Sequence, residues 1–376
     1  VFSKKLGEGS MQDMIKILAV ADPAIYAFGD KDLAIFDGFK AKVAFEAYPW
    51  NDYAKLLDKA LHHESDFDIV MIPGHLFLKD LVKDNLIAKI KRPLDVYYKS
   101  LYFDLNIEGN FYALPAFYDG HLVVFRKGVS EALDKKDGGV LTPDEFCSIA
   151  KNDFEHKFSL KAAASEIFTD ALPFLRWIDN GKIFDVYDDN GKIRDLALFE
   201  DRLKQYCELK DHAIEGTENF GNEEVAQAFI EGKTDLMITW SGQMGLIDQK
   251  LPLNNQEFGF ATLNTAWSAV WSFALLEKSS HKELCQDLFD YLQNPDIDLK
   301  CAKFSGTPLF AQNKFDKPWL KAQERMLSCF KPLPLIDNGP QKNGNLYAQI
   351  HKAYLKEESA QSALNNAYNE ILKLEA

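Results

Sequence analysis

Short apolar runs alternate with amphipathic segments along most of the chain. Residues 15–21 are apolar except for Lys16 and predict a buried strand, and residues 40–48 alternate as a half-buried strand does. Residues 50–61 have helical spacing and precede another apolar run at 65–72, so strand, helix and strand predict a βαβ unit with parallel strands. The predicted strands are 15–21, 40–48, 65–72, 109–114, 121–125, 235–239 and 267–276, and the predicted helices are 50–61, 78–90, 164–180, 197–210, 222–230, 282–293 and two within 345–375. This order predicts an α/β fold.

The segment 222–245 joins a helix, a strand and a polar turn. Its apolar residues have helical spacing behind a cap at Asn222 and up to Gly232, which allows the left-handed conformation that ends helices. A buried strand at 235–239 follows. It stops at three candidate ligand contacts, Trp240, Ser241 and Gln243. Ligands bind at the carboxyl ends of strands in open α/β sheets, although Trp240 can equally be part of the core.

Polar and aromatic side chains follow other predicted strands and crossovers. These further candidates are Asp22, Trp50, His75, Tyr118, Asp119, Trp267 and Trp271. Sugar rings stack on aromatic planes, and carboxylates and amides bond to hydroxyl groups, so the set indicates a small-molecule cleft. Each tryptophan can instead be a core residue, and Asp119 can be a turn residue before Gly120.

The length of 376 residues, 47% of them apolar, exceeds what one core usually supports and predicts two domains. The strand at 109–114 runs into a stretch at 115–120 that contains proline and glycine, and 121–125 is again strongly β-forming. Two strands joined in this way predict a crossover between lobes, and therefore a hinge.

Two local signals stand out in the second half of the chain. Thr142 precedes Pro143 and two acidic residues, which is typical of the start of a helix. The Asp-Asp-Asn-Gly sequence at 188–191 predicts a hairpin turn.

The chain carries 43 basic and 57 acidic residues, a net charge of −14. Binding to nucleic acid needs clustered Lys and Arg, so a nucleic-acid partner is not expected. No run of 18 apolar residues occurs, and we therefore predict no membrane span.

Motifs for metal binding and catalysis are missing from the sequence. The five cysteines are odd in number and scattered, without C-x-x-C or zinc spacing, so no metal site and at least one free thiol are expected. The sequence lacks G-x-S-x-G, H-E-x-x-H and Walker A motifs, and its one partial glycine motif, at Gly7 and Gly9, fails at the third glycine. We expect no cofactor and no catalytic group. The pair His62-His63 is read as a solvated helix end.

Residues 1–10 resemble a leader derived from a vector, because they end in Gly-Ser ahead of Met11 and contain no apolar segment of signal-peptide length. We exclude them from the fold and expect that any signal segment has been removed.

The order of several motifs resembles the family 1 extracellular solute-binding proteins, the maltose-binding-protein-like carbohydrate subunits of ABC importers. The matching segments are 43–53 (VAFEAYPWNDY), 65–90 (SDFDIVMIPGHLFLKDLVKDNLIAKI), 110–127 (NFYALPAFYDGHLVVFRK), 141–146 (LTPDEF), 222–245, 271–295, 306–308 and 331–332. Together they cover nearly all of 14–376.

The resemblance implies a two-lobed periplasmic-binding-protein fold of type II, with a ligand cleft between lobes joined by hinge crossovers. The N-terminal lobe would comprise 11–117 and 266–312, and the C-terminal lobe 118–265 and 313–376. Carried over by position, the resemblance assigns Asp22, His75, Asp119 and Glu166 to the ligand. Thr307, in the matching segment 306–308, is a further ligand-binding candidate. Departures point away from maltose itself: the family often has an aromatic residue where this chain has Gln243, and a stacking tryptophan near Leu346, where only Tyr347 adjoins.

We therefore expect a monomeric, non-enzymatic receptor that binds a carbohydrate, of oligosaccharide size, and delivers it to the permease subunits of an ABC importer. It would act in the periplasm or outside the cell, with or without a lipid anchor. Two alternatives stay open, a binder of a non-sugar solute such as a polyamine on the same fold, and a glycoside-acting enzyme, for which no acid/base pair is defined.

Overall fold

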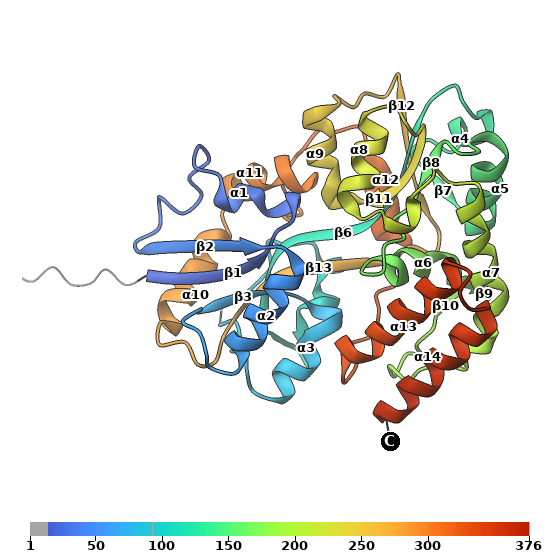
Figure 1. The fold of residues 1–376 in the computed structure, drawn as a ribbon. Coiled ribbons are helices and arrows are strands. Elements are labelled where there is room, and N and C mark those ends of the chain that lie inside the picture. Colours follow the sequence, from blue (N-terminus) through green and yellow to red (C-terminus); the bar gives the residue numbers. More distant parts are fainter. Residues whose placement is uncertain (1–13, 92, 376) are drawn as a thin grey trace, which may run out of the picture.

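The computed structural model describes residues 14–91 and 93–375, and the predicted leader at 1–10 lies outside them. The chain forms two lobes side by side, each with helices packed around strands (Figure 1). The predicted α/β fold is confirmed.

The first lobe is built on strands in the order β2-β1-β3-β13-β6. Its strands are β1 (Met14–Val20), β2 (Lys42–Tyr48), β3 (Ile69–Pro73), β13 (Ser268–Leu275) and the first half of β6 (Ala113–Arg126). β1 is parallel to β2 and β3, as the βαβ pattern predicts, and β13 runs antiparallel to β3 and β6. Its helices are α1 (Tyr26–Gly29), α2 (Trp50–Leu61), α3 (Gly74–Lys83), α10 (Lys282–Leu292) and α11 (Pro295–Ser305).

The second lobe is arranged around the other half of β6. There β6 pairs antiparallel with β11 (Leu236–Trp240) and with β12 (Phe258–Leu263), and the short strands β8 (Phe158–Ser159) and β7 (Val140–Leu141) flank β11 and β12. Its helices are α4 (Glu131–Asp134), α5 (Pro143–Asp153), α6 (Ile167–Leu175), α7 (Glu200–Glu208), α8 (Asn222–Ile230), α9 (Met244–Lys250), α12 (Leu320–Cys329), α13 (Gly339–Tyr354) and α14 (Ala360–Glu375). Two hairpins, β4 (Asn106–Ile107) with β5 (Asn110–Phe111) and β9 (Trp177–Asp179) with β10 (Lys182–Phe184), lie outside the main sheet.

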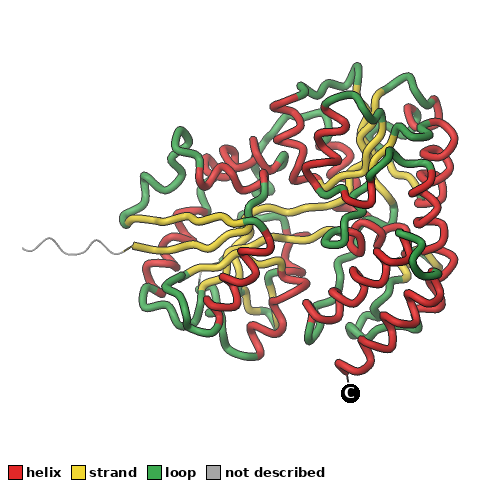
Figure 2. Tube along the Cα trace, in the orientation of Figure 1, coloured by secondary structure: helices red, strands yellow, loops and turns green. Residues whose placement is uncertain are grey.

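One continuous strand, β6, passes through both lobes (Figures 1 and 2). The prediction of two strands interrupted at 115–120 was wrong. Pro115, which has no N–H to give to a ladder, lies at a β-bulge where the register with β13 shifts between Trp271 and Ser272. Gly120 pairs with Ser268, so the strand continues without a break.

Separate apolar cores form around the two halves of this strand. One cluster of buried side chains draws from 15–118, 266–310 and Met326, and two others draw from 122–269 and 319–371. The domain boundaries at 117, 265 and 312 stay a prediction.

Several element boundaries differ from the prediction. The helix predicted at 78–90 begins at Gly74, where a Cβ would collide with the Asp104 carbonyl, and it ends at Lys83. The helix predicted at 164–180 ends at Leu175, because the extended Arg176 turns its side chain into the interior.

Other local predictions hold. Helix α5 has a complete capping box between Thr142 and Glu145. Gly191 has a positive φ of 76° in the predicted hairpin turn. Gly232 has a φ of 69° after α8, whose N-cap is Gly221 rather than the predicted Asn222.

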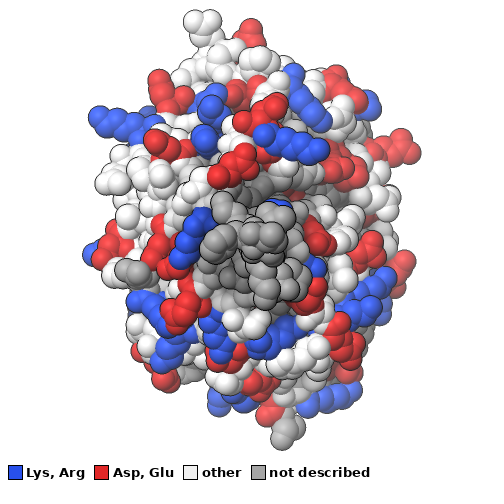
Figure 3. All heavy atoms as spheres, turned by 90° about the vertical axis from the view of Figure 1, so that its left-hand side faces the viewer, with Lys and Arg blue, Asp and Glu red and all other residues white. Residues whose placement is uncertain are grey.

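Acidic and basic side chains are interspersed over the face of the first lobe shown in Figure 3. This face has no large patch of a single sign among its described residues. The negative net charge is therefore spread rather than concentrated there.

Candidate ligand site between the lobes

A cavity of about 440 Å³ opens between the two lobes. We call it the inner cavity. Residues of both lobes line it: Val20, Ala21, Asp22, Trp50, Pro73, His75, Leu76, Phe77, Asp119, Ala164, Ser165, Glu166, Thr169, Asn222, Trp240, Trp267, Ala269, Trp271, Pro340, Asn343, Gly344 and Tyr347. Its volume lies within the usual range for small-molecule sites.

Asp22 comes from the first lobe, at the carboxyl end of β1. Its Oδ1 accepts a hydrogen bond of 2.8 Å from the Ala24 N–H and so caps a short 3-10 helix. Its Oδ2 accepts a bond of 3.4 Å from Gln243 Nε2, which belongs to the second lobe. Burial raises the pKa of Asp22 to about 6, against the opposing effect of the Ala24 bond and of Lys161.

Asp119 lies on β6 where the strand passes from one lobe to the other. Its Oδ1 accepts a hydrogen bond from the Gly242 N–H in the turn after β11. Burial and the nearby charge of Asp22 raise the pKa of Asp119 to about 8, although Lys161 opposes the shift. A Cβ at position 242 would collide with this carboxylate, so only glycine allows the approach.

Glu166 belongs to the second lobe, immediately before α6. Burial raises the pKa of Glu166 to about 7, and Asp170 and Asp22 add to the rise. Asp22, Asp119 and Glu166 thus hold protons at higher pH than ordinary carboxyl groups do.

The aromatic rings of the inner cavity contact one another at steep angles. Trp240 and Trp267 have centroids 5.1 Å apart and planes at 79°, and His75 meets Trp267 at 4.9 Å and 85°. Trp271 stacks on Phe117 at 11° and meets Trp50 at 85°. Ring faces at several orientations therefore border the same space.

A buried ion-pair network lies behind Trp240. Lys161 is 0% exposed, and its Nζ is 4.2 Å from the centroid of the Trp240 ring and 3.3 Å from Asp170 Oδ2. The other oxygen of Asp170 is 3.4 Å from His121 Nε2, and burial lowers the pKa of His121. Lys161, Asp170 and His121 were not among the site residues predicted from the sequence.

The structure brings together most of the predicted site residues. Those that line the inner cavity are Asp22, Trp50, His75, Asp119, Glu166, Trp240, Trp267 and Trp271. Gln243 does not line it but bonds to Asp22, and Ser241 Oγ instead accepts the Gly120 N–H at 3.1 Å.

Tyr118 and Thr307 lie elsewhere, in a separate cavity of about 410 Å³ beside α12. Successive side chains of a strand point to opposite faces, so Tyr118 and Asp119 cannot both face the inner cavity. Thr307 Oγ1 donates to Gln323 Oε1 there.

Several lining residues were not predicted. Thr169 on α6, Asn222 on α8 and Asn343 on α13 reach the inner cavity from helices. Tyr347 joins them and donates its hydroxyl to Thr169 Oγ1 at 3.2 Å. The only signal for Tyr347 in the sequence was its place beside Leu346 in the family pattern.

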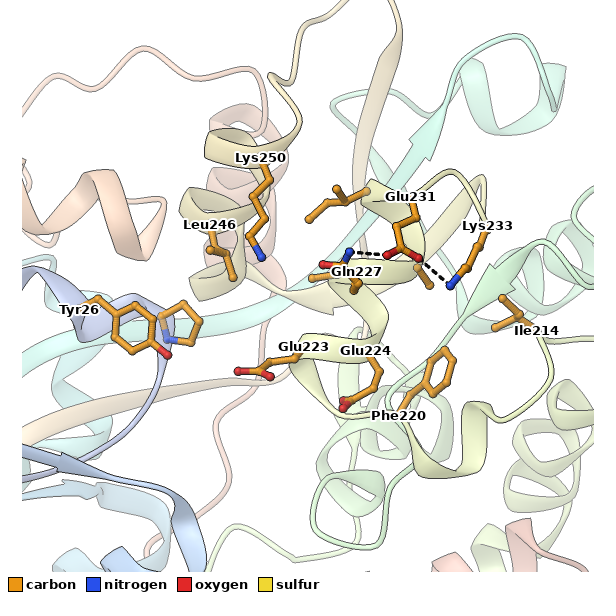
Figure 4. A pocket seen from close by; sticks show the side chains of 14 residues that line it. Tyr26, Ile214, Phe220, Glu223, Glu224, Gln227, Glu231, Lys233, Leu246 and Lys250 are labelled. Atoms are coloured by element: carbon orange, nitrogen blue, oxygen red, sulfur yellow. Dashed lines mark hydrogen bonds and ion pairs between the residues drawn. The ribbon is translucent and has the colours of Figure 1, made fainter.

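An outer cavity of about 580 Å³ is also lined by residues of both lobes (Figure 4). Tyr26 faces it from the first lobe, and α8 and α9 border it from the second. Its lining residues Pro23 and Glu223 directly follow Asp22 and Asn222 of the inner cavity. The walls of the two cavities therefore include neighbouring residues of the chain at 22–23 and at 222–223.

Within 14–91 and 93–375, no group of three or more His, Cys, Asp or Glu side chains is arranged to hold a metal ion. None of the helices in this part of the chain has both the length and the hydrophobicity that crossing a bilayer requires.

Solved structures of solute-binding proteins share this fold. Maltose-bound MalE3 of T. maritima has a TM-score of 0.79 at 18% identity, over 96% of this chain and 99% of that chain. The GacH receptor of Streptomyces glaucescens, solved unliganded and with acarbose, has a TM-score of 0.76 at 15% identity, over 97% and 99%. An ABC transporter solute-binding protein of Agrobacterium radiobacter in complex with ribitol has a TM-score of 0.77 at 15% identity, over 96% and 98%. The fold is therefore that of the two-lobed solute-binding proteins.

A model of the bacterial extracellular solute-binding protein family matches residues 34–326, and the chain belongs to this family. The resemblance noted in the sequence is confirmed. The family places the protein in the periplasm or outside the cell, and its members bind solutes rather than catalyse reactions. No curated protein matches the sequence significantly.

Proposed function

We propose that this protein captures a carbohydrate between its lobes and delivers it, as a monomer, to the permease subunits of an ABC importer. The observation that carries the proposal is the wall of the inner cavity, where tryptophan faces stand beside carboxylates. Trp240, Trp267 and Trp271 can stack on the C–H faces of a sugar ring, while Asp22 and Glu166 bond to its hydroxyls.

The arrangement also gives the ligand a means to close the lobes. Asp22 belongs to the first lobe, Glu166 to the second, and Asp119 to the strand between them. A ligand that contacts all three has more favourable interactions in the closed state than in an open one, and so shifts the population toward closure. The permease can then recognise the closed shape.

The outer cavity favours an oligosaccharide over a single sugar. It too lies between the lobes, and it presents Tyr26, which is 43% exposed, as a further aromatic face. A chain of sugar rings can extend from one cavity into the other.

A thermal-shift screen tests the proposal directly. A ligand present at a hundred times its Kd stabilises the native state by about 2.7 kcal/mol, which is a readily measured rise in Tm. We expect a rise with at least one saccharide, no change in that saccharide afterwards, and a smaller radius of gyration by X-ray scattering. Rises only with amino acids or polyamines would contradict a carbohydrate ligand, and conversion of the saccharide would contradict a pure receptor.

A further inference from the structure

Acidic residues outnumber basic residues in the lining of the inner cavity. Asp22, Asp119 and Glu166 line it, and none of its described lining residues is Lys or Arg. The outer cavity differs, because Lys233 and Lys250 line it together with its glutamates, and Lys233 pairs with Glu231 at 2.6 Å. In Figure 4 both lysines are visible beside α8. The three glutamates of the outer cavity, Glu223, Glu224 and Glu231, are thus accompanied by two lysines, whereas no described basic residue lines the inner cavity beside its acids.

The nearest cation does not balance this charge. Lys161 lies behind Trp240 and its closest carboxylate is Asp170, at 3.3 Å, whereas Glu166 is 4.0 Å away. His121 is on the far side of Asp170, and its lowered pKa keeps it neutral near pH 7. The ammonium group of Lys161 is therefore the nearby positive charge for four carboxyl groups, those of Asp170, Glu166, Asp22 and Asp119.

Carboxylates that are removed from water are costly unless they are hydrogen-bonded, protonated or paired with a cation. Asp22 and Asp119 already accept hydrogen bonds, and a cationic ligand would add the opposite charge that the lining lacks. The tryptophan faces around the inner cavity attract cations as well, through the negative charge of their π clouds. The tryptophan faces and the carboxyl groups of the inner cavity therefore both favour a cationic ligand group.

The tryptophan faces distinguish an amino sugar from a simple amine. Trp240, Trp267 and Trp271 line the inner cavity and offer ring faces to C–H groups as well as to a cation. A sugar ring that carries an amino group can use both, whereas a polyamine has no ring to stack on them.

We propose that the inner cavity selects saccharides that carry a protonated amino group, held by Asp22, Asp119 and Glu166 while the sugar ring stacks on the tryptophan faces. This inference rests on the proposed function. It narrows the ligand class from carbohydrates in general to amino sugars, and it places the charged group where the two lobes and β6 meet.

Matched pairs of ligands test the inference. We would measure binding, by calorimetry and by tryptophan fluorescence, of glucosamine, galactosamine and mannosamine and of glucosamine oligomers, each against its N-acetyl form. At about pH 6.5 the free amines are largely protonated, and the N-acetyl forms carry no charge. We expect the amine of at least one pair to bind about tenfold or more tightly than its N-acetyl form.

A variant that removes the charge of Glu166 tests whether this residue causes the preference for the amine. Glu166→Gln keeps the size of the side chain and should weaken binding of the amine by a larger factor than binding of the N-acetyl form, so that most of the preference for the amine is lost. Glu231→Gln, which removes a charge from the outer cavity instead, should leave the preference as in the unmodified protein.

The inference would be overturned if every amine binds no more tightly than its N-acetyl form, or if no amine binds at all. The proposed function would still stand if a neutral saccharide binds. Binding of spermidine or putrescine alone would overturn both. Should Glu166→Gln fail to fold, the ligand pairs measured on the unmodified protein still decide the matter.

Discussion

Asp119 is the buried acid whose ionisation is most disfavoured among the three in the inner cavity. Its pKa rises from 3.8 to about 8, so between these values the folded protein binds a proton that the unfolded chain has released. Stability from this group is full below about pH 4 and is lost as the pH rises toward 8. Asp22 and Glu166 act in the same direction, with pKa values of about 6 and 7.

We predict that Asp119→Asn weakens this pH dependence. The amide oxygen can still accept the Gly242 N–H, but no proton is exchanged at this position on unfolding. The Tm of ligand-free Asp119→Asn should therefore fall less between about pH 5 and 8 than that of the unmodified protein. Asp201→Asn serves as control, because that side chain is 98% exposed. Parallel Tm profiles for Asp119→Asn and the unmodified protein would contradict the raised pKa.

Substitution of Trp271 distinguishes a role in ligand stacking from a role in core packing. Its ring is partly exposed between Phe117 and Trp50, whereas Trp240 is 6% exposed and packs on His121. We predict that Trp271→Ala weakens saccharide binding by about 1–3 kcal/mol with a small change in Tm. Trp240→Ala should lower both affinity and Tm, because it also leaves a cavity over Lys161.

Trp177→Ala provides the matched control for calorimetry. Trp177 stacks on Phe184 at 4.3 Å and does not line the inner cavity, so its removal should lower Tm and leave affinity unchanged. Unaltered affinity in Trp271→Ala would remove the stacking argument.

Single site residues can be predicted from the sequence where they follow strands, because the carboxyl ends of parallel strands meet at one edge of a sheet. Asp22, His75 and Trp240 were found in this way. Lys161 was not, because its role depends on Asp170 and Trp240, which approach it only through tertiary packing. Tyr118 was misplaced because a bulge decides which of two neighbours on β6 faces the cavity.

Helix α5 shows how local sequence signals fix an element. Thr142 Oγ1 accepts the Glu145 N–H at 3.1 Å, and Glu145 Oε2 accepts the Thr142 N–H at 2.8 Å. We predict that Thr142→Ala lowers the free energy of unfolding by about 1 kcal/mol, measured by urea denaturation, because an N–H at the helix start loses its partner. Thr142→Ser should keep most of the stability, and neither variant should change ligand affinity. A loss in the serine variant as large as in the alanine variant would contradict the capping role.

Element boundaries were predictable where the signal is local and failed where the tertiary structure decides. The residue-by-residue match of α2 follows from the spacing of its buried residues Tyr53, Leu57 and Ala60. Helix α6 ends earlier than its periodicity suggests, because Arg176 is drawn away to a distant partner. No local pattern carries that information.

Arg176 connects the second lobe to a crossover between the lobes. It is fully buried, forms an ion pair with Asp185, and donates from Nη1 to the carbonyls of Ala266 at 3.0 Å and Thr265 at 3.4 Å. These carbonyls lie in the segment that joins β12 to β13. Arg176 therefore fixes one of the connections on which the relative position of the lobes depends.

We predict that Arg176→Met lowers the free energy of unfolding by about 3–5 kcal/mol, because Asp185 is left buried without its partner. The double variant Arg176→Met/Asp185→Leu should regain part of this loss in denaturant titrations, since no unpaired charge remains. A double variant less stable than Arg176→Met alone would show that the lost bonds to the crossover carbonyls, rather than the unpaired charge, dominate.

For the whole molecule, the order of strands and helices predicted the α/β class, and the family pattern predicted the two lobes. The order of the strands in the sheet could not be predicted. Strand β13 lies between β3 and β6 in the sheet but follows β6 by more than a hundred residues in the sequence. The continuity of β6 was missed because proline and glycine read as a break in sequence, while Ser241 Oγ and β13 provide partners that keep the strand intact.

The continuous strand also limits how this protein can change over evolutionary time. A loop absorbs an added or deleted residue, but β6 is paired with β13 on one side of Gly120 and with β11 and β12 on the other. A length change near Asp119 would force one half of the strand out of register and turn each of its side chains to the opposite face. New ligand preferences can therefore arise through substitutions on this strand, while insertions and deletions are confined to the loops around the two lobes.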